Sequence, residues 1–209
     1  FGAFQCNLLL EGFYTRLNHV FVLEEIGKDE EHNAVIKERR NGQGAEVAGV
    51  TVEGKVAYLS LVQLQAGVTW QKSHYTRPEK WSKDSSVPAE KRIFRTPDWY
   101  GYFTATYSPV KPLNIALSGT YTGSMIVQHM KGYIPKDIAV TTPDFFDMNL
   151  KISYDFSLYK FITLQLNAGI QNIFNAYQRD FDRGKERDSG YIYGPSMPRS
   201  YFAGAKLMF

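Results

Sequence analysis

The sequence has few of the features that mark helical membrane proteins or disulfide-rich domains. Its 209 residues include one cysteine, Cys6, which excludes an intrachain disulfide framework and a cysteine-based zinc cluster. No apolar run approaches the ~18 residues that a membrane-spanning helix needs. The net charge of +3 is small and the charges are mixed, which argues against nucleic acid as a partner. Since an initiating Met and a basic, apolar leader are both missing, we expect a mature chain or a piece of a longer one.

Aromatic residues, in contrast, are abundant, and apolar residues alternate with polar ones. The chain contains 14 Tyr, 14 Phe and 3 Trp, which together make up 15% of the sequence. In the segment 146–155 every second residue is apolar: Phe146, Met148, Leu150, Ile152 and Tyr154. A period of two is that of a β-strand and is incompatible with an amphipathic helix. The composition and the period therefore predict an all-β, antiparallel protein.

The alternation predicts about eight strands, each near the ~9–11 residues that a tilted strand needs to cross a bilayer. They are expected at 3–17, 44–58, 61–76, 97–108, 111–126, 144–156, 160–173 and 199–209. The connections alternate in length: those at 59–60, 109–110 and 157–159 are tight, and those at 18–43, 77–96, 127–143 and 174–198 are long and polar. Short turns at one end and long loops at the other are typical of an outer-membrane β-barrel.

The polar faces of the strands favour a water-lined lumen over the dry core of a β-sandwich. The charged and amide residues expected there are Glu53, Lys55, Asp147, Asn149, Lys151 and Asp155, while the apolar alternates would face lipid. Aromatic residues expected in interfacial belts near the strand ends are Tyr58, Trp70, Trp99, Tyr100, Tyr102, Tyr107, Tyr121, Tyr154, Tyr159 and Phe161. A half-exposed sheet would alternate in the same way. The polar residues expected to face inward are large, and the long connections total about 90 residues by these boundaries. Both features fit a segment of a wider barrel better than a closed eight-stranded barrel, whose interior is narrow.

Four short motifs, in order along the chain, resemble those of TonB-dependent outer-membrane receptors. Gly169-Ile170-Gln171-Asn172-Ile173-Phe174-Asn175, followed by Ala176-Tyr177, resembles the motif that precedes the last strand of those receptors. Gly12-Phe13-Tyr14-Thr15-Arg16-Leu17 and Gly49-Val50-Thr51-Val52-Glu53 are similar to two of their barrel strands. Pro198-Arg199-Ser200-Tyr201-Phe202-Ala203-Gly204, ending in an aromatic, resembles their final strand. The segment 190–195 looks most like receptors of the Bacteroidetes.

The resemblance implies a 22-stranded barrel with an N-terminal plug domain and a TonB box, of which residues 1–209 would be the C-terminal eight strands. It implies TonB-coupled uptake of a scarce nutrient across the outer membrane of a Gram-negative bacterium. A ferric siderophore or haem is favoured, with cobalamin and glycans as further candidates. The implied partners are outer-membrane lipid and lipopolysaccharide, the TonB complex through the plug domain, and a small-molecule nutrient. No cofactor is expected.

The sequence predicts neither a catalytic site nor a metal site, and we expect the protein not to be an enzyme. Nothing gathers Ser, His and Asp into one motif. The segment 124–130 carries two Met and His129, which are residue types that bind haem iron or copper, but a lipid-facing Met125 and a solvated His129 are the favoured explanation. The charged segment 180–188 lacks the spacing of an EF-hand and is expected to be a self-neutralising solvated loop. Residues 37–40 are expected to form a loop arm.

Three residues of the long loops are the candidates for substrate contact: Trp81, His129 and Tyr133. Trp81 lies between Lys80 and Lys83. Exposure of a Trp side chain to water is unfavourable unless a partner covers it, which suggests a ligand. Packing of the loop on itself would explain the Trp equally well. The hydroxyl groups of the tyrosine-rich loops suit a substrate-contact surface. Two further functions stay open from the sequence: a complete eight-stranded barrel with a structural or adhesion role, and a soluble β-sandwich binding module.

Overall fold

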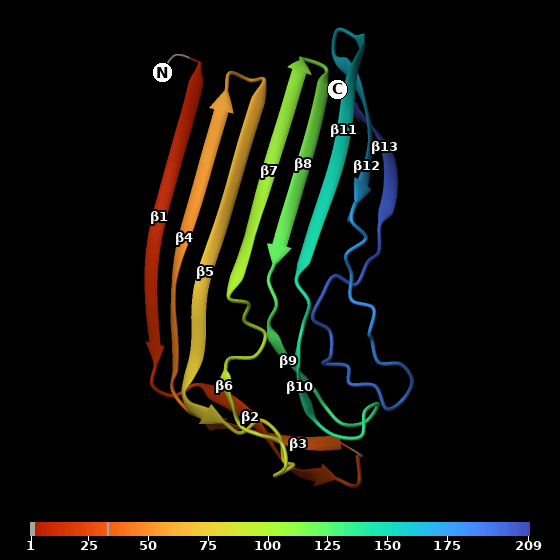
Figure 1. Cartoon of the computed structure of the whole chain (residues 1–209). Coiled ribbons are helices and arrows are strands. Elements are labelled where there is room, and N and C mark those ends of the chain that lie inside the picture. Colours follow the sequence, from red (N-terminus) through yellow and green to blue (C-terminus); the bar gives the residue numbers. More distant parts are fainter. Residues whose placement is uncertain (1–2, 33) are drawn as a thin grey trace.

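The computed structural model describes residues 3–32 and 34–209, and eight long antiparallel strands dominate it (Figure 1). These strands are β1 (Phe4–Leu17), β4 (Ala45–Tyr58), β5 (Val62–Glu79), β7 (Trp99–Val110), β8 (Leu113–Thr122), β11 (Phe145–Tyr159), β12 (Ile162–Gln171) and β13 (Ser200–Met208). They follow one another in the sheet in that order, each hydrogen-bonded to the next. In the part of the chain that the structure describes, no helix is long and apolar enough to cross a membrane.

Five further strands lie in the long connections at the lower end of the molecule in Figure 1. β2 (Phe21–Asp29) and β3 (Ala34–Asn41) form one separate hairpin, and β9 (Ile126–His129) and β10 (Ile138–Thr141) form another. β6 (Glu90–Arg92) pairs with the end of β5. The tight turns lie at the opposite end of the sheet, where β1 begins and β13 ends. We call the end with the long connections the outer end.

The all-β antiparallel fold and its eight long strands are confirmed, with boundaries within a few residues for most strands. The strand expected at 111–126 is the exception, because β8 ends at Thr122 and Ile126 begins β9. Residues 37–40 were wrongly expected in a loop arm, since they belong to β3. Paired strands satisfy their backbone hydrogen bonds whether or not one face is buried. The side chains of β3 are almost all exposed, and this explains why that segment shows no clean alternation.

The register of the sheet separates an apolar face from a polar face. One row of directly paired residues crosses all eight strands and is almost wholly apolar: Cys6, Val56, Leu64, Ala105, Leu117, Leu150, Ile170 and Tyr201. The neighbouring row, on the opposite face, is polar across six strands: Asn7, Lys55, Gln65, Thr104, Ser118 and Asn149. Glu53 and Asp147 lie on the polar face too, in a row that passes through Gly67, Tyr102 and Thr120.

Aromatic residues gather near the strand ends on the apolar face, as expected, but not all of them lie there. At the turn end the ring of Phe4 lies 4.6 Å from that of Tyr58, and at the outer end Trp70 lies 6.3 Å from Trp99. Tyr102 belongs instead to the polar face, where its hydroxyl accepts a hydrogen bond from Gln65 at 3.2 Å. Gly67 leaves room for the Tyr102 ring, since a Cβ at that position would come within 2.7 Å of it.

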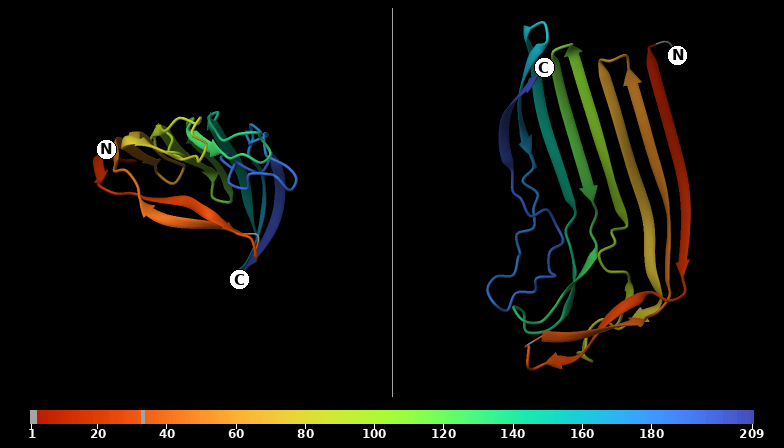
Figure 2. Two further views of the ribbon diagram at one scale, coloured as in Figure 1. Left: turned by 90° about the horizontal axis from the view of Figure 1, so that it is seen from below. Right: turned by 180° about the vertical axis from the view of Figure 1, so that it is seen from behind.

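The sheet is an open arc, with β1 and β13 at its two edges (Figure 2). The β2–β3 hairpin leaves the outer end of β1 and crosses the concave side of the arc towards β13, as the left view of Figure 2 shows. Arg40 of β3 lies 3.3 Å from the buried carboxylate of Glu79, which ties the base of the hairpin to β5. The outer end is therefore partly covered by the chain's own connections.

Candidate functional site

A small hydrophobic core lies in the outer connections, away from the sheet. It consists of Met125, Val127 and Tyr191, against which Val140 and Tyr193 pack. The expectation that Met125 faces lipid is wrong, because its side chain is buried in this core. The strand β8 ends three residues before it, so the chain has already left the sheet where Met125 begins the β9–β10 hairpin. This core supports the candidate site.

His129 and Asp182 form a buried pair above this core. His129 Nε2 lies 3.0 Å from Asp182 Oδ1 and 2.9 Å from Oδ2, and the two side chains are 8% and 2% exposed. The imidazole stacks on the ring of Tyr191, with 3.7 Å between centroids and 7° between planes. His129 is therefore not the solvated loop residue that the sequence favoured. The contact joins His129 to a residue 53 positions away in the sequence, and no local sequence pattern predicts such a contact.

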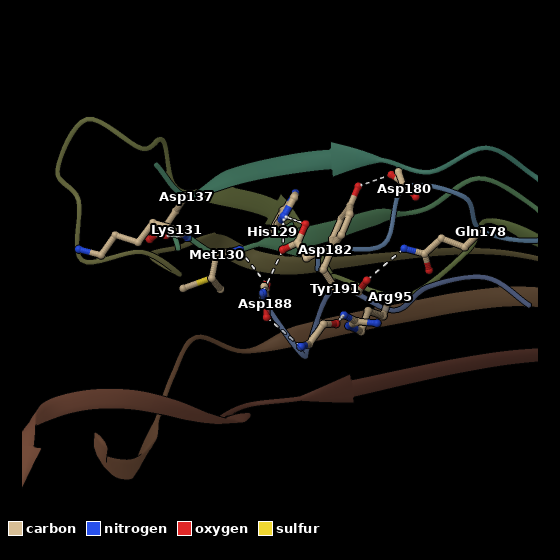
Figure 3. Close-up of polar contacts among 11 residues, drawn as sticks. Arg95, His129, Met130, Lys131, Asp137, Gln178, Asp180, Asp182, Asp188 and Tyr191 are labelled. Carbon is tan, nitrogen blue, oxygen red and sulfur yellow. Dashed lines mark hydrogen bonds and ion pairs between the residues drawn. The ribbon is translucent and has the colours of Figure 1, made fainter. Parts of the chain in front are cut away.

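The segment 180–188 also differs from the expected solvated loop, because its carboxylates bind backbone amides. Asp188 donates its backbone N–H to Asp182 Oδ2 at 2.9 Å, and Met130 donates its own to Asp188 Oδ2 at 2.8 Å (Figure 3). Carboxylates that accept N–H groups are held firmly, since such bonds are charge-assisted. Arg183, Lys185 and Glu186 stay exposed, so the solvated description still fits part of the segment.

Gln178 and Arg95 form hydrogen bonds with the backbone of residues 190–193. Gln178 is almost fully buried, where it donates from Nε2 to Tyr191 O at 3.0 Å and accepts from Tyr193 N at 2.8 Å. Arg95, from the β6–β7 connection, donates to the carbonyl oxygens of Gly190 and Ile192, the latter at 2.7 Å. The two arms of the 172–199 connection are thus bound to each other and to a second connection (Figure 3).

Asp137 provides the third tie. Its Oδ2 accepts from Ser82 Oγ at 2.5 Å and its Oδ1 accepts from Lys131 N at 2.7 Å, and its side chain is buried. Ser82 belongs to the β5–β6 connection, whereas Asp137 belongs to the β9–β10 hairpin. The connections 80–98, 123–144 and 172–199 therefore interlock through buried polar contacts. We call these three segments together the outer cluster.

Two tyrosines share one carboxylate at the surface of the outer cluster. Tyr191 donates its phenol proton to Asp180 Oδ2 at 2.8 Å and Tyr193 donates to Oδ1 at 2.6 Å. Burial and the bonded carboxylate raise the pKa of both phenols, that of Tyr193 to about 12. Burial opposes ionisation of Asp180, but the two phenol hydrogen bonds outweigh it and lower the pKa of this carboxyl. The group is a carboxylate held by two neutral phenols.

A hollow of about 420 Å³ opens beside the His129–Asp182 pair. Its lining residues are His129, Tyr133, Arg179, Asp180, Phe181, Asp182, Arg183 and Tyr191. The structure thus brings together two of the three candidates for substrate contact, His129 and Tyr133. Residues 179–183 line the hollow as well, and the sequence singled them out only for their density of charge.

Trp81 does not line this hollow. Its ring meets that of Phe94 edge-on at 5.3 Å, and its indole N–H donates to Pro88 O at 3.1 Å. The indole is half-buried within its own connection, which is the packing explanation that the sequence left open. Nothing in its contacts calls for a ligand.

The site offers hydrogen-bonding groups and rings, without a preformed metal cluster. Across residues 3–32 and 34–209, no group of three or more His, Cys, Asp and Glu side chains is arranged to hold a metal ion. His129 directs Nε2 at a carboxylate, and that carboxylate is also bonded to a backbone amide. Such a geometry suits binding and mechanical support.

Comparison with known proteins identifies the barrel. A family model described as "TonB dependent receptor-like, beta-barrel" matches residues 4–173. The crystal structure of the ferric-catecholate import receptor Fiu from Escherichia coli K12 is similar with a TM-score of 0.58 at 20% identity, over 96% of this chain and 25% of that one. The siderophore receptor PirA from Acinetobacter baumannii is similar with a TM-score of 0.60 at 16% identity, over 98% of this chain and 30% of that one.

No curated protein sequence matches the chain. The chain spans between a quarter and a third of the length of the two solved receptors, and its fold is that of part of their barrels. The family match covers 170 residues, from Phe4 to Ile173, and includes seven of the eight long strands. This chain belongs to the TonB-dependent receptor-like β-barrel family.

Proposed function

We propose that the chain forms part of the barrel wall and outer connections of a receptor that imports a ferric siderophore, driven by TonB, across the outer membrane of a Gram-negative bacterium. The observation that carries this proposal is the family match over residues 4–173, which coincides with the two-faced sheet. In this proposal residues 1–209 are the C-terminal eight strands of a 22-stranded barrel. The role of the chain is to position and attract the substrate, without a chemical step.

The two faces of the sheet have different partners under this proposal. The apolar face, with its aromatic ends, would meet outer-membrane lipid, and the basic residues of the outer connections would meet lipopolysaccharide. The polar face, with Glu53, Lys55 and Asp147, would line the passage. TonB would act through a plug domain, which does not belong to these eight strands.

A ferric siderophore is favoured over haem by the state of His129. An axial haem ligand needs a ring nitrogen that haem iron can reach, whereas the His129 side chain is only 8% exposed, with Nε2 bonded to Asp182 and the ring stacked on Tyr191. Of the two methionines in the segment, Met125 is buried in the hydrophobic core and Met130 is exposed. The two solved structures are described as a ferric-catecholate import receptor and a siderophore receptor, which supports the same choice. Cobalamin and glycans have no comparable support.

The alternative of a closed eight-stranded barrel fits the structure poorly. β1 and β13 are the two edges of the sheet within the described chain, and they do not pair with each other. Both edges expose apolar side chains, among them Leu8, Leu10 and Leu207. Unpaired edges of this length invite association with further strands, which a larger barrel supplies.

The proposal is tested by deleting the gene of the receptor that contains this chain and measuring iron uptake from defined sources. We expect uptake from at least one ferric siderophore to be lost, to return with the intact gene, and to require the proton gradient. Uptake from haem and uptake of cobalamin, measured in the same cells, should not change. Normal uptake from every ferric siderophore tested would exclude the proposal.

A further inference from the structure

We propose that the hollow beside His129 and Asp182 is a binding subsite for an oxyanion attached to an aromatic ring, such as a catecholate or benzoate group. The inference rests on the proposed function for the source of the ligand, but the site itself is argued from the side chains that line the hollow. It assigns ligand contact to Arg179, Arg183 and Tyr133, and support to His129.

The hydrogen-bond acceptors of the hollow are already occupied. Both oxygens of Asp180 accept phenol protons, from Tyr191 and Tyr193. Both oxygens of Asp182 accept from His129, and one also accepts from a backbone amide. A ligand that brought its own donors would therefore have to share these oxygens with the bonds that they already accept. An oxygen-rich ligand without donors suits these walls better.

The donors, in contrast, are free. Arg179 and Arg183 line the hollow, and neither guanidinium donates a hydrogen bond within the part of the chain that the structure describes. The guanidinium of Arg179 lies 5.1 Å from the centroid of the Tyr177 ring, which steadies it and leaves its N–H groups open. Arginine presents a planar fork of donors that matches paired oxygens, as on a carboxylate or a deprotonated catechol.

The remaining walls are flat rings that suit an aromatic ligand. Tyr133, which is 55% exposed, and the half-buried Phe181 both line the hollow. Aromatic side chains favour stacked or edge-on contact with a second aromatic ring. The volume of about 420 Å³ holds one or two substituted rings, which is a portion of a siderophore.

His129 is a positioning residue in this scheme. It holds Asp182 at 2.9 Å and stacks on Tyr191, so that the segment carrying Arg179 and Arg183 is fixed against the β9–β10 hairpin, where Tyr133 lies. A binding wall that is ordered before the ligand arrives loses less conformational entropy on binding.

The test uses the intact receptor purified in detergent, titrated with the ferric complex of 2,3-dihydroxybenzoate. We expect Arg179→Gln and Arg183→Gln each to raise the dissociation constant about tenfold, since each removes charge-assisted bonds. Tyr133→Leu should raise it several-fold. Lys185→Gln is the control, because it removes the same charge from the same segment outside the hollow, and it should change binding less than about twofold.

The ligand can come from two sources, which a second titration separates. Phosphate groups of lipopolysaccharide offer oxyanions without a ring, so binding to vesicles that contain lipopolysaccharide should not depend on Tyr133. Loss of vesicle binding in Tyr133→Leu, or wild-type affinity for the ferric complex in both arginine variants, would overturn the subsite. So would an equal loss in Lys185→Gln, which would indicate general charge attraction.

Failure of the subsite and failure of the proposed function give different results. If all variants bind and import the ferric complex like the wild type, the subsite is wrong and siderophore import stands. If deletion of the receptor leaves ferric-siderophore uptake intact while the arginine variants still lose the ferric complex in vitro, the import proposal is wrong and the subsite stands. Equal heat-modifiable migration of the variants on a gel shows that each barrel has folded.

Discussion

At the scale of single residues, the chain contains two histidine–aspartate pairs whose surroundings differ. His32 Nδ1 lies 2.8 Å from Asp29, with side chains 71% and 36% exposed, while His129 Nε2 lies 2.9 Å from Asp182, with side chains 8% and 2% exposed. Pairs in water contribute at most about 1 kcal/mol, because solvent screens them and the side chains lose freedom. A buried carboxylate that loses its donor is much more costly. Only the second pair should matter for stability.

We predict that His129→Asn opens the outer cluster locally, because Asn is too short to place a donor where Nε2 lies. The free energy of local opening should fall by about 2 kcal/mol. His129→Gln, whose amide nitrogen reaches that position, should restore most of the loss. Hydrogen exchange at the amides of Met130 and Asp188 measures the opening, since both amides are bonded to carboxylates of the same network. His32→Asn should leave exchange at both amides unchanged, and a similar effect of the two Asn variants would contradict the argument.

A second prediction at this scale concerns alkaline pH. The pKa of Tyr193 is raised from 10.0 to about 12, so between these values the folded protein keeps a proton that the unfolded chain has released. The contribution of Tyr193 to stability is therefore complete below about pH 10 and is lost as the pH rises through about 12. Tyrosinate absorbance, taken as the difference between wild type and Tyr193→Phe, should show a midpoint near 12. In an Asp180→Asn background the midpoint should move towards the ordinary value, and a wild-type midpoint near 10 would refute the account.

At the scale of elements, the long strands could be predicted from the sequence and the outer cluster could not. β11 could be predicted because the alternation of apolar and polar residues from Phe146 to Asp155 is a property of consecutive residues. The contacts that bury His129 and bind Gly190 join residues 53 and 95 positions apart. In the outer cluster, contacts between particular pairs of distant residues determine the structure, and no regular spacing in the sequence predicts which residues will pair. The sequence therefore pointed to two residues that line the hollow, His129 and Tyr133, and gave Arg179 and Arg183 only as cations of a charged loop.

Glycines inside the strands provide an element-scale test of close packing. A Cβ at Gly169 of β12 would lie 2.4 Å from the backbone oxygen of Leu150 and equally close to the ring of Phe202. Gly54 of β4 is a strand glycine with no atom within 4 Å of its Cβ position. We predict that Gly169→Ala destabilises the barrel by about 1–3 kcal/mol, because a backbone atom must move. Gly54→Ala should leave stability unchanged or slightly higher. Urea midpoints of the receptor refolded into lipid vesicles compare the two variants, and equal midpoints would show that the sheet relaxes freely around Gly169.

At the scale of the whole molecule, the chain is a curved wall with two unlike faces and a covered outer end. Cys6, Leu117 and Ile170 lie in one apolar row that crosses the complete sheet, so the division between faces is a property of the assembled sheet and not of any one strand. The open edges, β1 and β13, belong to an arc that further strands would close. The outer cluster and the β2–β3 hairpin both lie at the end away from the tight turns.

The two faces make the most direct test of the barrel assignment. Leu117 and Ser118 are neighbours in β8, with Leu117 in the apolar row and Ser118 in the polar row. If the apolar face meets lipid, Leu117→Arg places a charge in hydrocarbon and should cost about 2–4 kcal/mol, as arginine does near the midplane of other barrels. Ser118→Arg places the same charge on the face that already carries Lys55 and Lys151, where water solvates it, and should cost less than about 1 kcal/mol. Refolding into lipid vesicles across a urea series measures both changes, and the amount of receptor in the outer membrane should fall for Leu117→Arg alone. An equal loss of stability in the two variants would mean that neither face meets lipid, and a greater loss for Ser118→Arg would mean that the faces are reversed. These conclusions follow because the two substitutions differ only in the side of the sheet on which the charge lies.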